Sequence, residues 1–479
     1  MRKTDILGYR RSWPFAVCSL FFLLFLFSQP QAVQADEPAA DSPTGLCERT
    51  TLLGAMGGFR TLLGKYGITF ALSETSEVLG NSSGGVRRGA DYEGATLMSL
   101  GLETDKSFGW RGGTFFVSAL QLHGRGLSAD NLDNLNTVSG IEAQRTTRLW
   151  ELWFQQAFLG GKADVKIGQI GIDQEFLLSQ CCSIYLNAMM GWPVLPAADL
   201  YAGGPAFPLS SPAVRLRVQP GDSLSLLAGV FDDNPPGGSF DDDAQLRDDE
   251  ASGTRFNMTT GALFIGEVQY ALNSPPGVSG CGYKGAAGLP GAYKLGAWFD
   301  TAKFPDRRFS ASGLSLADPA GEQTPRMDRN NYSIYAIADQ AVWREPGGPR
   351  MVSAFVRFMG APHDRNLVDW SLNAGVNVTP LLPGRLNDVL GIGYGWAHVS
   401  GRAADLDRDT SFYSGAPYPV RGAEQFIEIT CRFQIAPGWI IQPDLQYIID
   451  PGGGVSDPLN PSGLVGNELV LGLRTIINF

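Results

Sequence analysis

The 479-residue sequence has few charged side chains and only three histidines. Charged residues make up 18% of the chain and the mean hydropathy is −0.05, so long apolar spans are not expected. After the amino-terminal segment, no stretch reaches the roughly 18 consecutive apolar residues that a membrane-spanning helix needs. Neither an H-E-x-x-H motif nor a P-loop occurs. The sequence therefore predicts no enzyme activity and no cofactor.

Cysteine is also scarce, with six residues, one of which lies in the apolar segment near the amino terminus. No C-x-x-C pair occurs, so zinc and other metals are not expected. An odd number remains beyond that segment, and two of them are adjacent in sequence, which makes a bond between those two strained. One long-range disulfide is expected in an oxidising compartment, with its partners left open among Cys47, Cys181, Cys182, Cys281 and Cys431.

The first 35 residues have the features of a signal peptide. Basic residues precede the apolar run Phe15–Phe27, and Val33 and Ala35 fit the small-residue positions of a cleavage site before Asp36. The segment carries four basic side chains and one acidic, so its removal takes 37 basic and 48 acidic residues to 33 and 47, a net charge of −14. Such an acidic chain is not expected to bind nucleic acid.

Residues 36–67 are expected to form a linker followed by a short helix. The polar, proline-bearing stretch 36–45 is typical of a linker. Glu48–Gly67 then spaces its apolar residues as an amphipathic helix does, although its glycines weaken that prediction. The helix is expected either at the periplasmic mouth of the protein or in an interfacial linker.

From Ile68 to the end of the chain, apolar and polar residues alternate with a period of two. In Ala213–Pro220 the valines and leucine fall on one side and two arginines on the other, and Trp439–Ile449 repeats the pattern. This alternation fits a β-sandwich or a closed barrel. Full charges opposite large apolar faces, with aromatics near strand ends, favour a transmembrane barrel. About 410 residues at roughly 25 per strand predict an all-β antiparallel barrel of about 16 strands, spanning 68–479, with inward-folded loops.

Several longer segments together resemble one family. They include LPGAYKLGAWFDT (Leu289–Thr301), RLWELWFQQAF (Arg148–Phe158) and DQEFLLSQCCSIYLNAMMG (Asp173–Gly191). The carboxy-terminal third adds QPDLQYIIDPGG and the terminal LVLGLRTIINF. The chain resembles the carbohydrate-selective porins of Gram-negative outer membranes, of the glucose-porin B type. The adjacent cysteines 181 and 182 and the acid-rich loop after Phe231 depart from that family.

The resemblance implies a monomeric, 16-stranded barrel in the cell outer membrane, reached after signal-peptide export. Such a barrel lets monosaccharides such as glucose diffuse passively through a polar constriction. The terminal aromatic Phe479 resembles the carboxy-terminal signature that the outer-membrane assembly machinery reads.

Polar side chains on the expected inward faces are the candidates for contact with a sugar. Arginine, carboxylate and glutamine side chains exchange hydrogen bonds with hydroxyl groups, and an aromatic face stacks on a pyranose. Mixed charges with glutamines suit a neutral polyhydroxyl solute, whereas a ring of one sign suits an ion. The predicted channel residues are Arg215, Arg217, Glu151, Trp298, Arg357, Glu428, Arg432, Gln442, Asp444 and Gln446.

Each candidate has a plainer interpretation. Arg215 and Arg217 would form a basic ladder at a constriction, or would merely pair with carboxylates across a polar wall. Trp298 would stack on sugar, or anchor the barrel at the membrane interface. The acidic segment Phe231–Gly253 is expected to be a solvated extracellular loop, with binding of a divalent cation as the alternative.

Other function classes remain open at this point. A general porin for other solutes would share every feature of the barrel. A barrel hydrolase would need a Ser–His–Asp set, which is defined in space and not by sequence spacing. A soluble β-sandwich lectin would have alternating strands, but would not need a terminal aromatic on an apolar face.

Overall fold

The computed structural model describes residues 49–240, 251–274, 281 and 288–479. The predicted signal peptide (residues 1–35), the linker 36–45 and Cys47 lie outside the described residues. Among the described residues, no helix is long and apolar enough to cross a membrane.

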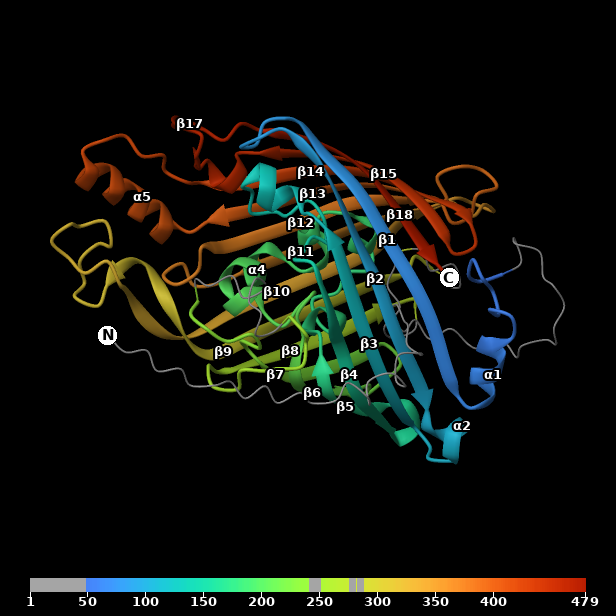
Figure 1. Cartoon of the computed structure of the whole chain (residues 1–479). Coiled ribbons are helices and arrows are strands. Elements are labelled where there is room, and N and C mark those ends of the chain that lie inside the picture. Colours follow the sequence, from blue (N-terminus) through green and yellow to red (C-terminus); the bar gives the residue numbers. More distant parts are fainter. Residues whose placement is uncertain (1–48, 241–250, 275–280, 282–287) are drawn as a thin grey trace, which may run out of the picture.

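Sixteen antiparallel strands form one closed barrel, as predicted (Figure 1). Consecutive strands pair along most of the ring, and β1 pairs with β18 to close it. The strands are β1 (Ile68–Ser83), β2 (Gly89–Glu103), β3 (Gly113–Gly124), β4 (Thr146–Phe158), β5 (Ala163–Ile170), β6 (Ser211–Val218), β7 (Leu224–Asp232), β8 (Ala262–Leu272), β9 (Gly291–Ser310), β10 (Pro325–Arg344), β11 (Met351–Gly360), β12 (Val368–Thr379), β13 (Val389–Val399), β14 (Ala423–Ala436), β15 (Trp439–Ile449) and β18 (Glu468–Asn478).

The closing strand β18 has one apolar face and one polar face. Leu471 and Leu473 point outward and are 49% and 53% exposed. Arg474 points inward, lies opposite Glu77 of β1 in the strand register, and donates a hydrogen bond to its carboxylate. The two faces therefore suit two different surroundings, with the ion pair on the inside joining the first and last strands.

The predicted amino-terminal helix forms only in its second half, as α1 (Phe59–Lys65). Gly54, Gly57 and Gly58 all have positive φ angles, between 54° and 88°. Glycine adopts this left-handed backbone readily, so the preceding residues form turns instead of helix. Helical apolar spacing alone overestimated the length of the helix.

This amino-terminal segment binds the end of β18. Arg60 of α1 donates hydrogen bonds to the terminal Phe479 carbonyl oxygen and, at 2.8 Å, to that of Gly54. The backbone N–H of Leu52 donates to the Asn478 carbonyl at 2.8 Å. Figure 1 shows α1 and the carboxyl terminus at the same end of the barrel.

The two ends of the barrel differ in their connections. The short-turn end carries the tight β4–β5, β6–β7 and β14–β15 turns and α2 (Thr104–Phe108). The opposite, long-loop end carries extended loops that include α5 (Gly401–Ser414) and a small sheet of β16 (Ser456–Asp457) and β17 (Asn460–Leu464). Two further long loops at this end, β3–β4 and β5–β6, enter the lumen.

The start of the acidic segment does not match its prediction. Residues 231–237 are buried, whereas a solvated loop was expected from the run of aspartates. Asp233 is 1% exposed, and burial raises the pKa of its carboxyl group above the usual range. Residues 241–250 lie outside the described part, and the described residues contain no group of carboxylate, histidine or cysteine side chains suited to holding a metal ion.

Candidate solute channel

The β5–β6 loop, residues 171–210, crosses the inside of the barrel. It contains five short helical segments: η4 (Ile172–Gln174), η5 (Cys182–Ile184), α3 (Ala188–Gly191), α4 (Val194–Asp199) and η6 (Tyr201–Gly203). Phe176, Leu186 and Leu195 of this loop are completely buried. Burial of these apolar residues stabilises the loop in its position inside the lumen, compared with a loop that extends into water outside the barrel.

Inward-facing apolar side chains of the wall form the other half of this core. Trp298, Tyr335 and Phe355 are each at most 4% exposed and belong to the same apolar cluster as the loop residues. The Tyr185 and Phe355 rings lie 5.6 Å apart between centroids. One side of the lumen is therefore filled, not lined by water.

Arg357 of β11 fixes α3 of the loop. Its guanidinium donates hydrogen bonds to the carbonyl oxygens of Met189 at 2.5 Å, Met190 at 3.0 Å and Gly191 at 2.8 Å. It also donates to the carbonyl of Leu177 at 3.1 Å. The last carbonyls of a helix lack intrahelical partners and attract cations, so Arg357 caps α3 from the wall.

Three other predicted residues hold the same loop from β14 and β15. Glu428 accepts hydrogen bonds from the backbone N–H of Leu186 at 2.5 Å and of Asn187 at 3.2 Å. Gln442 donates to the Ile184 carbonyl at 2.5 Å. Gln446 accepts from the Asn187 side chain at 3.0 Å.

Gln446 also contacts the second inward loop, β3–β4, residues 125–145, which contains η2 (Ser128–Leu132). Its amide donates to the Val138 carbonyl at 2.8 Å and to Asp444 at 3.0 Å. Asp444 thus orients the amide that joins both loops. These side chains all lie on inward faces, as the alternation predicts.

Glu424 of β14 anchors the β3–β4 loop. Its carboxylate accepts from the backbone N–H groups of Leu135 at 2.7 Å and Asn136 at 2.6 Å. It also accepts from Gly452 at 2.6 Å, in the connection between β15 and β18. A single buried carboxylate therefore fixes two segments of the long-loop end.

Glu151 of β4 holds the start of the β5–β6 loop, because its carboxylate accepts from the Gly171 N–H at 3.1 Å. On the far side, Asp339 of β10 accepts from the Ser179 hydroxyl at 2.6 Å and the Gln180 N–H at 3.0 Å. The loop is therefore held from well-separated parts of the wall.

Arg215 and Arg217 of β6 share one carboxylate. Both donate to Asp164 of β5, Arg217 at 2.6 Å. Arg215 also lies 2.8 Å from Glu175 of the β5–β6 loop and is only 4% exposed, whereas the Arg217 side chain is 34% exposed. The interpretation of arginines paired across a polar wall describes these contacts, and Arg217 alone keeps substantial access to solvent.

Arg432 and Trp298 differ from the other candidates. Arg432 lies on β14 and is half-buried, and within the described part of the chain it has no hydrogen bond or ion pair. Trp298 points inward, as expected, but is 2% exposed within the core beneath the loop. A solute has no open face of Trp298 to stack on in this arrangement.

The family model described as "Carbohydrate-selective porin, OprB family" matches residues 87–479. The chain belongs to this family. It is 25% identical to Porin B of Pseudomonas aeruginosa over 445 residues, which cover 88% of this chain and 90% of that protein. It is 24% identical over 437 residues to a putative porin, QuiX, of Acinetobacter baylyi, covering 85% and 90%.

Among solved structures, the chain is similar to OprB of Pseudomonas putida at high pH, with a TM-score of 0.77 and 24% identity over 90% of this chain and 99% of that one. This likeness supports the barrel fold. The porin accordingly belongs in the outer membrane, where long loops face outward and short turns face the periplasm.

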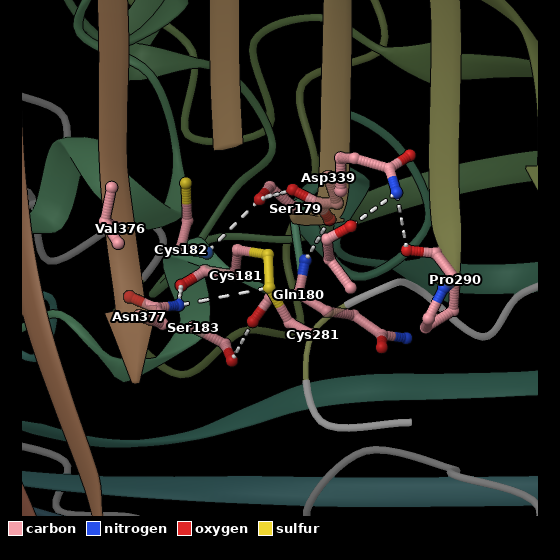
Figure 2. The surroundings of a disulfide bond; sticks show 12 residues. Ser179, Gln180, Cys181, Cys182, Ser183, Cys281, Pro290, Asp339, Val376 and Asn377 are labelled. Atoms are coloured by element: carbon pink, nitrogen blue, oxygen red, sulfur yellow. Dashed lines mark hydrogen bonds between the residues drawn. A yellow bond between two sulfur atoms is a disulfide. The ribbon is translucent and has the colours of Figure 1, made fainter. Parts of the chain in front are cut away.

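A disulfide joins the β5–β6 loop of this porin to the connection between β8 and β9. Cys181 and Cys281 are bonded, with their Cα atoms 5.3 Å apart, and Figure 2 shows the bridge beside Asn377 of β12. The Asn377 amide donates to the Cys181 carbonyl at 2.8 Å. The single long-range disulfide that the sequence predicts is confirmed, and it links connections from opposite ends of the barrel.

The other described cysteines are free. Cys182 is buried, and burial raises the pKa of its thiol to about 12, so the neighbouring thiol is a poor nucleophile toward the bridge. Cys431 lies on β14. The choice of Cys281 as partner depends on how two distant loops meet, which spacing does not reveal.

Several anchors of this porin were not among the predicted residues, notably Glu424, Asp339 and Asn377. Each lies on a strand with clear alternation, on the buried face. Their inward position could have been predicted from that pattern. Their partners could not, because loop backbone atoms carry no sequence signal.

Proposed function

We propose that this porin passes monosaccharides such as glucose by passive diffusion, through the part of the lumen that the two inward loops leave open. The observation that supports this size limit is the attachment of the β5–β6 loop at Arg357, Glu428 and Glu151, on different parts of the wall. A loop held from several sides narrows the passage permanently. The family consists of channels and not enzymes, which supports diffusion without catalysis.

Within this proposal the predicted residues divide into two roles. Arg357, Glu428 and Gln446 set the position of the loops, because their polar groups are used by loop backbone and side-chain atoms. Arg217 and Arg432 keep donors available to a passing solute. Guanidinium groups bind sugar hydroxyls well, and two separate contacts keep binding weak enough for release.

Assembly by the outer-membrane machinery is part of the proposal. The terminal aromatic Phe479 ends the strand that closes the barrel, and we propose that the assembly machinery reads it before Arg60 binds its carbonyl. The partners of the folded porin would then be its sugar solutes and the membrane lipid.

Liposome swelling tests the proposal with full-length porin. Glucose should enter faster than a neutral non-sugar solute of equal size, and disaccharides should enter slowly. Arg217→Ala and Arg432→Ala should each reduce the preference for sugar. Arg408→Ala, on the exposed face of α5, is the matched control and should leave it unchanged.

Entry rates that depend on size alone, in the native chain and in every variant, would contradict sugar selectivity. That result would favour a general porin. Disaccharide entry as fast as glucose entry would contradict the proposed narrowing by the loops.

A further inference from the structure

A basic cavity lies at the long-loop end of the barrel, among the β11–β12 loop (residues 361–367), the outer ends of β13 and β14, and α5. Its volume is about 560 Å³, inside the roughly 300–1,000 Å³ typical of ligand sites. We call it the rim cavity. Among the described residues, its ionisable lining consists of His363, His398, Arg402, Asp405, Arg408 and Arg421. Basic side chains thus outnumber acidic ones here, although the chain as a whole is acidic.

The carboxylates beside the rim cavity are already paired with arginines. Asp405 lies 2.6 Å from Arg408 and 2.7 Å from Arg308 of β9. Asp407 of α5 accepts two hydrogen bonds from the Arg421 guanidinium, at 2.8 Å and 2.9 Å. These pairs fix the arginines in place and neutralise both carboxylates.

Arg402 and His363 have no such partner, since neither makes a hydrogen bond or an ion pair within the described part of the chain. The Arg402 guanidinium lies over the Phe309 ring, 4.9 Å from its centroid, and its Nε is buried without a hydrogen-bond acceptor. Asp364, next to His363, instead accepts two hydrogen bonds from Arg365, both at 2.9 Å. A buried guanidinium N–H without an acceptor costs free energy, so it indicates a place for an anion.

The first turn of α5 adds to this positive charge. Gly401 and Ala404 line the cavity, and the Ser400 hydroxyl caps the helix by accepting from the Ala403 N–H at 3.3 Å. The helix is 14 residues long, and the N-terminus of a helix carries a partial positive charge that favours anions. The helix end and the Arg402 guanidinium therefore attract the same kind of ligand.

The rim cavity lies on the outer side of the barrel wall. His398 is at an even spacing from Ile392 on β13, and Ile392 is 49% exposed on the outside. The strand register also pairs His398 with Trp370 of β12, which is 42% exposed, and with Ala423 of β14. Because alternate residues and cross-strand pairs share a face, His398 points away from the lumen.

Aromatic side chains lie directly below the cavity on this outer face. The Phe358 and Trp370 rings stack with their centroids 5.2 Å apart, and the Trp396 and His398 rings lie 5.6 Å apart. Exposed aromatics at the ends of barrel strands mark the membrane interface. Figure 1 shows α5 beyond the strand ends on the long-loop side. The cavity is therefore at the level of the lipid headgroups of the outer leaflet.

We propose that the rim cavity binds the phosphate group of a phosphorylated glycolipid of the outer leaflet. Guanidinium groups form paired hydrogen bonds with phosphate oxygens, and Arg402 has free donors. His398 is held by Asp369 at 2.6 Å and Arg421 by Asp407, so both are positioned before the ligand binds. The cavity is large enough for a phosphorylated sugar, and the aromatic surface below it suits acyl chains. A free phosphate ion would use neither feature.

Titration of full-length porin in detergent micelles with lipid A, followed by native mass spectrometry, tests the proposal. The native chain should bind lipid A, and fully dephosphorylated lipid A should bind much more weakly. The double variant Arg402→Gln, His363→Gln should bind lipid A roughly ten-fold more weakly, the factor that loss of a charge-assisted hydrogen bond predicts. Arg385→Gln, in the β12–β13 connection at the short-turn end, is the matched control and should bind with native affinity.

Three results would overturn the proposal. One is equal lipid A binding by the native chain and by the double variant, when heat-modifiable gel migration shows that both are folded. Another is tight binding of the dephosphorylated lipid, which would show that acyl chains and sugar alone account for the contact. The third is complete displacement of lipid A by an equal concentration of inorganic phosphate, which would identify a site for a free anion. Glucose entry into liposomes should stay native in the double variant, so the proposed function is tested separately.

Discussion

Replacing Arg357 by alanine tests directly whether the barrel wall holds the β5–β6 loop in the channel. The guanidinium is 1% exposed and donates to the carbonyls of Leu177, Met189, Met190 and Gly191. Alanine removes every one of these donors at once. The carbonyls at the end of α3 then lose their partners inside a crowded, poorly hydrated space.

The size of the effect follows from these contacts. A hydrogen bond to a charged group contributes about 1.5–3 kcal/mol, and several bonds from one group do not add fully. Leaving a buried carbonyl without a donor costs about 1–3 kcal/mol, so loss of several such donors that do not add fully should cost about 3–5 kcal/mol in total. At about 1.4 kcal/mol per factor of ten, the ratio of docked to undocked loop should fall by roughly two to three and a half powers of ten.

Planar-bilayer recording and liposome swelling measure the consequence. Arg357→Ala should give a larger and noisier single-channel conductance, and disaccharides should enter at a rate closer to that of glucose. Arg408→Ala on α5 serves as the control for loss of one positive charge. If folded Arg357→Ala porin keeps the native conductance and the native exclusion of disaccharides, the inference that this arginine positions the constriction is wrong.

Three further predictions concern other contacts of the loops. Cys281→Ser breaks the disulfide, which spans 100 residues and contributes up to about 4.7 kcal/mol by chain entropy. The temperature of the heat-modifiable transition should therefore be lower in the variant than in the native chain. A reductant should lower this temperature for the native chain but not for the variant. Glu424→Ala leaves the backbone N–H groups of Leu135 and Asn136 without an acceptor, which costs about 1–3 kcal/mol per buried donor. Proteases should therefore cleave residues 125–145 faster in the variant. An unchanged cleavage rate would contradict the anchoring of this loop by Glu424. Burial raises the pKa of Asp199 to about 7 from 3.8, so the folded chain binds this proton more tightly and the free energy of unfolding should decrease as pH rises from about 4 to 7. Asp199→Asn should remove that part of the slope in thermal melts, and an identical slope would exclude Asp199 as its source.

The strand count and the two faces of each strand were predictable because a barrel in lipid separates two surroundings. Alternation in β18 places Leu471 outside and Arg474 inside without any knowledge of the neighbours. The same pattern placed Glu428 and Gln446 inside. It did not say that a loop would use their polar groups, because a carboxylate facing water and one facing a loop N–H look the same in sequence.

The apolar core inside the lumen shows a second limit of pattern reasoning. Tyr335 and Phe355 point inward, against the rule that the lumen is polar, and pack against the β5–β6 loop. Only the folded loop explains them. The short α1 has a local cause instead, since the left-handed glycines before it interrupt an otherwise helical spacing.

The division between anchoring and exposed residues has a consequence for selectivity. Most polar side chains predicted to contact sugar are used by the loops, so a solute meets chiefly loop backbone and the side chains that the loops leave free. A conservative change at an anchor, such as Gln446→Glu, would then alter selectivity without touching the solute, because the amide donates to Val138 and accepts from Asn187 at the same time. A carboxylate accepts at both positions and donates at neither, so it repels the Val138 carbonyl. Selectivity in this porin therefore depends on how the wall positions its loops as much as on the groups that line the opening.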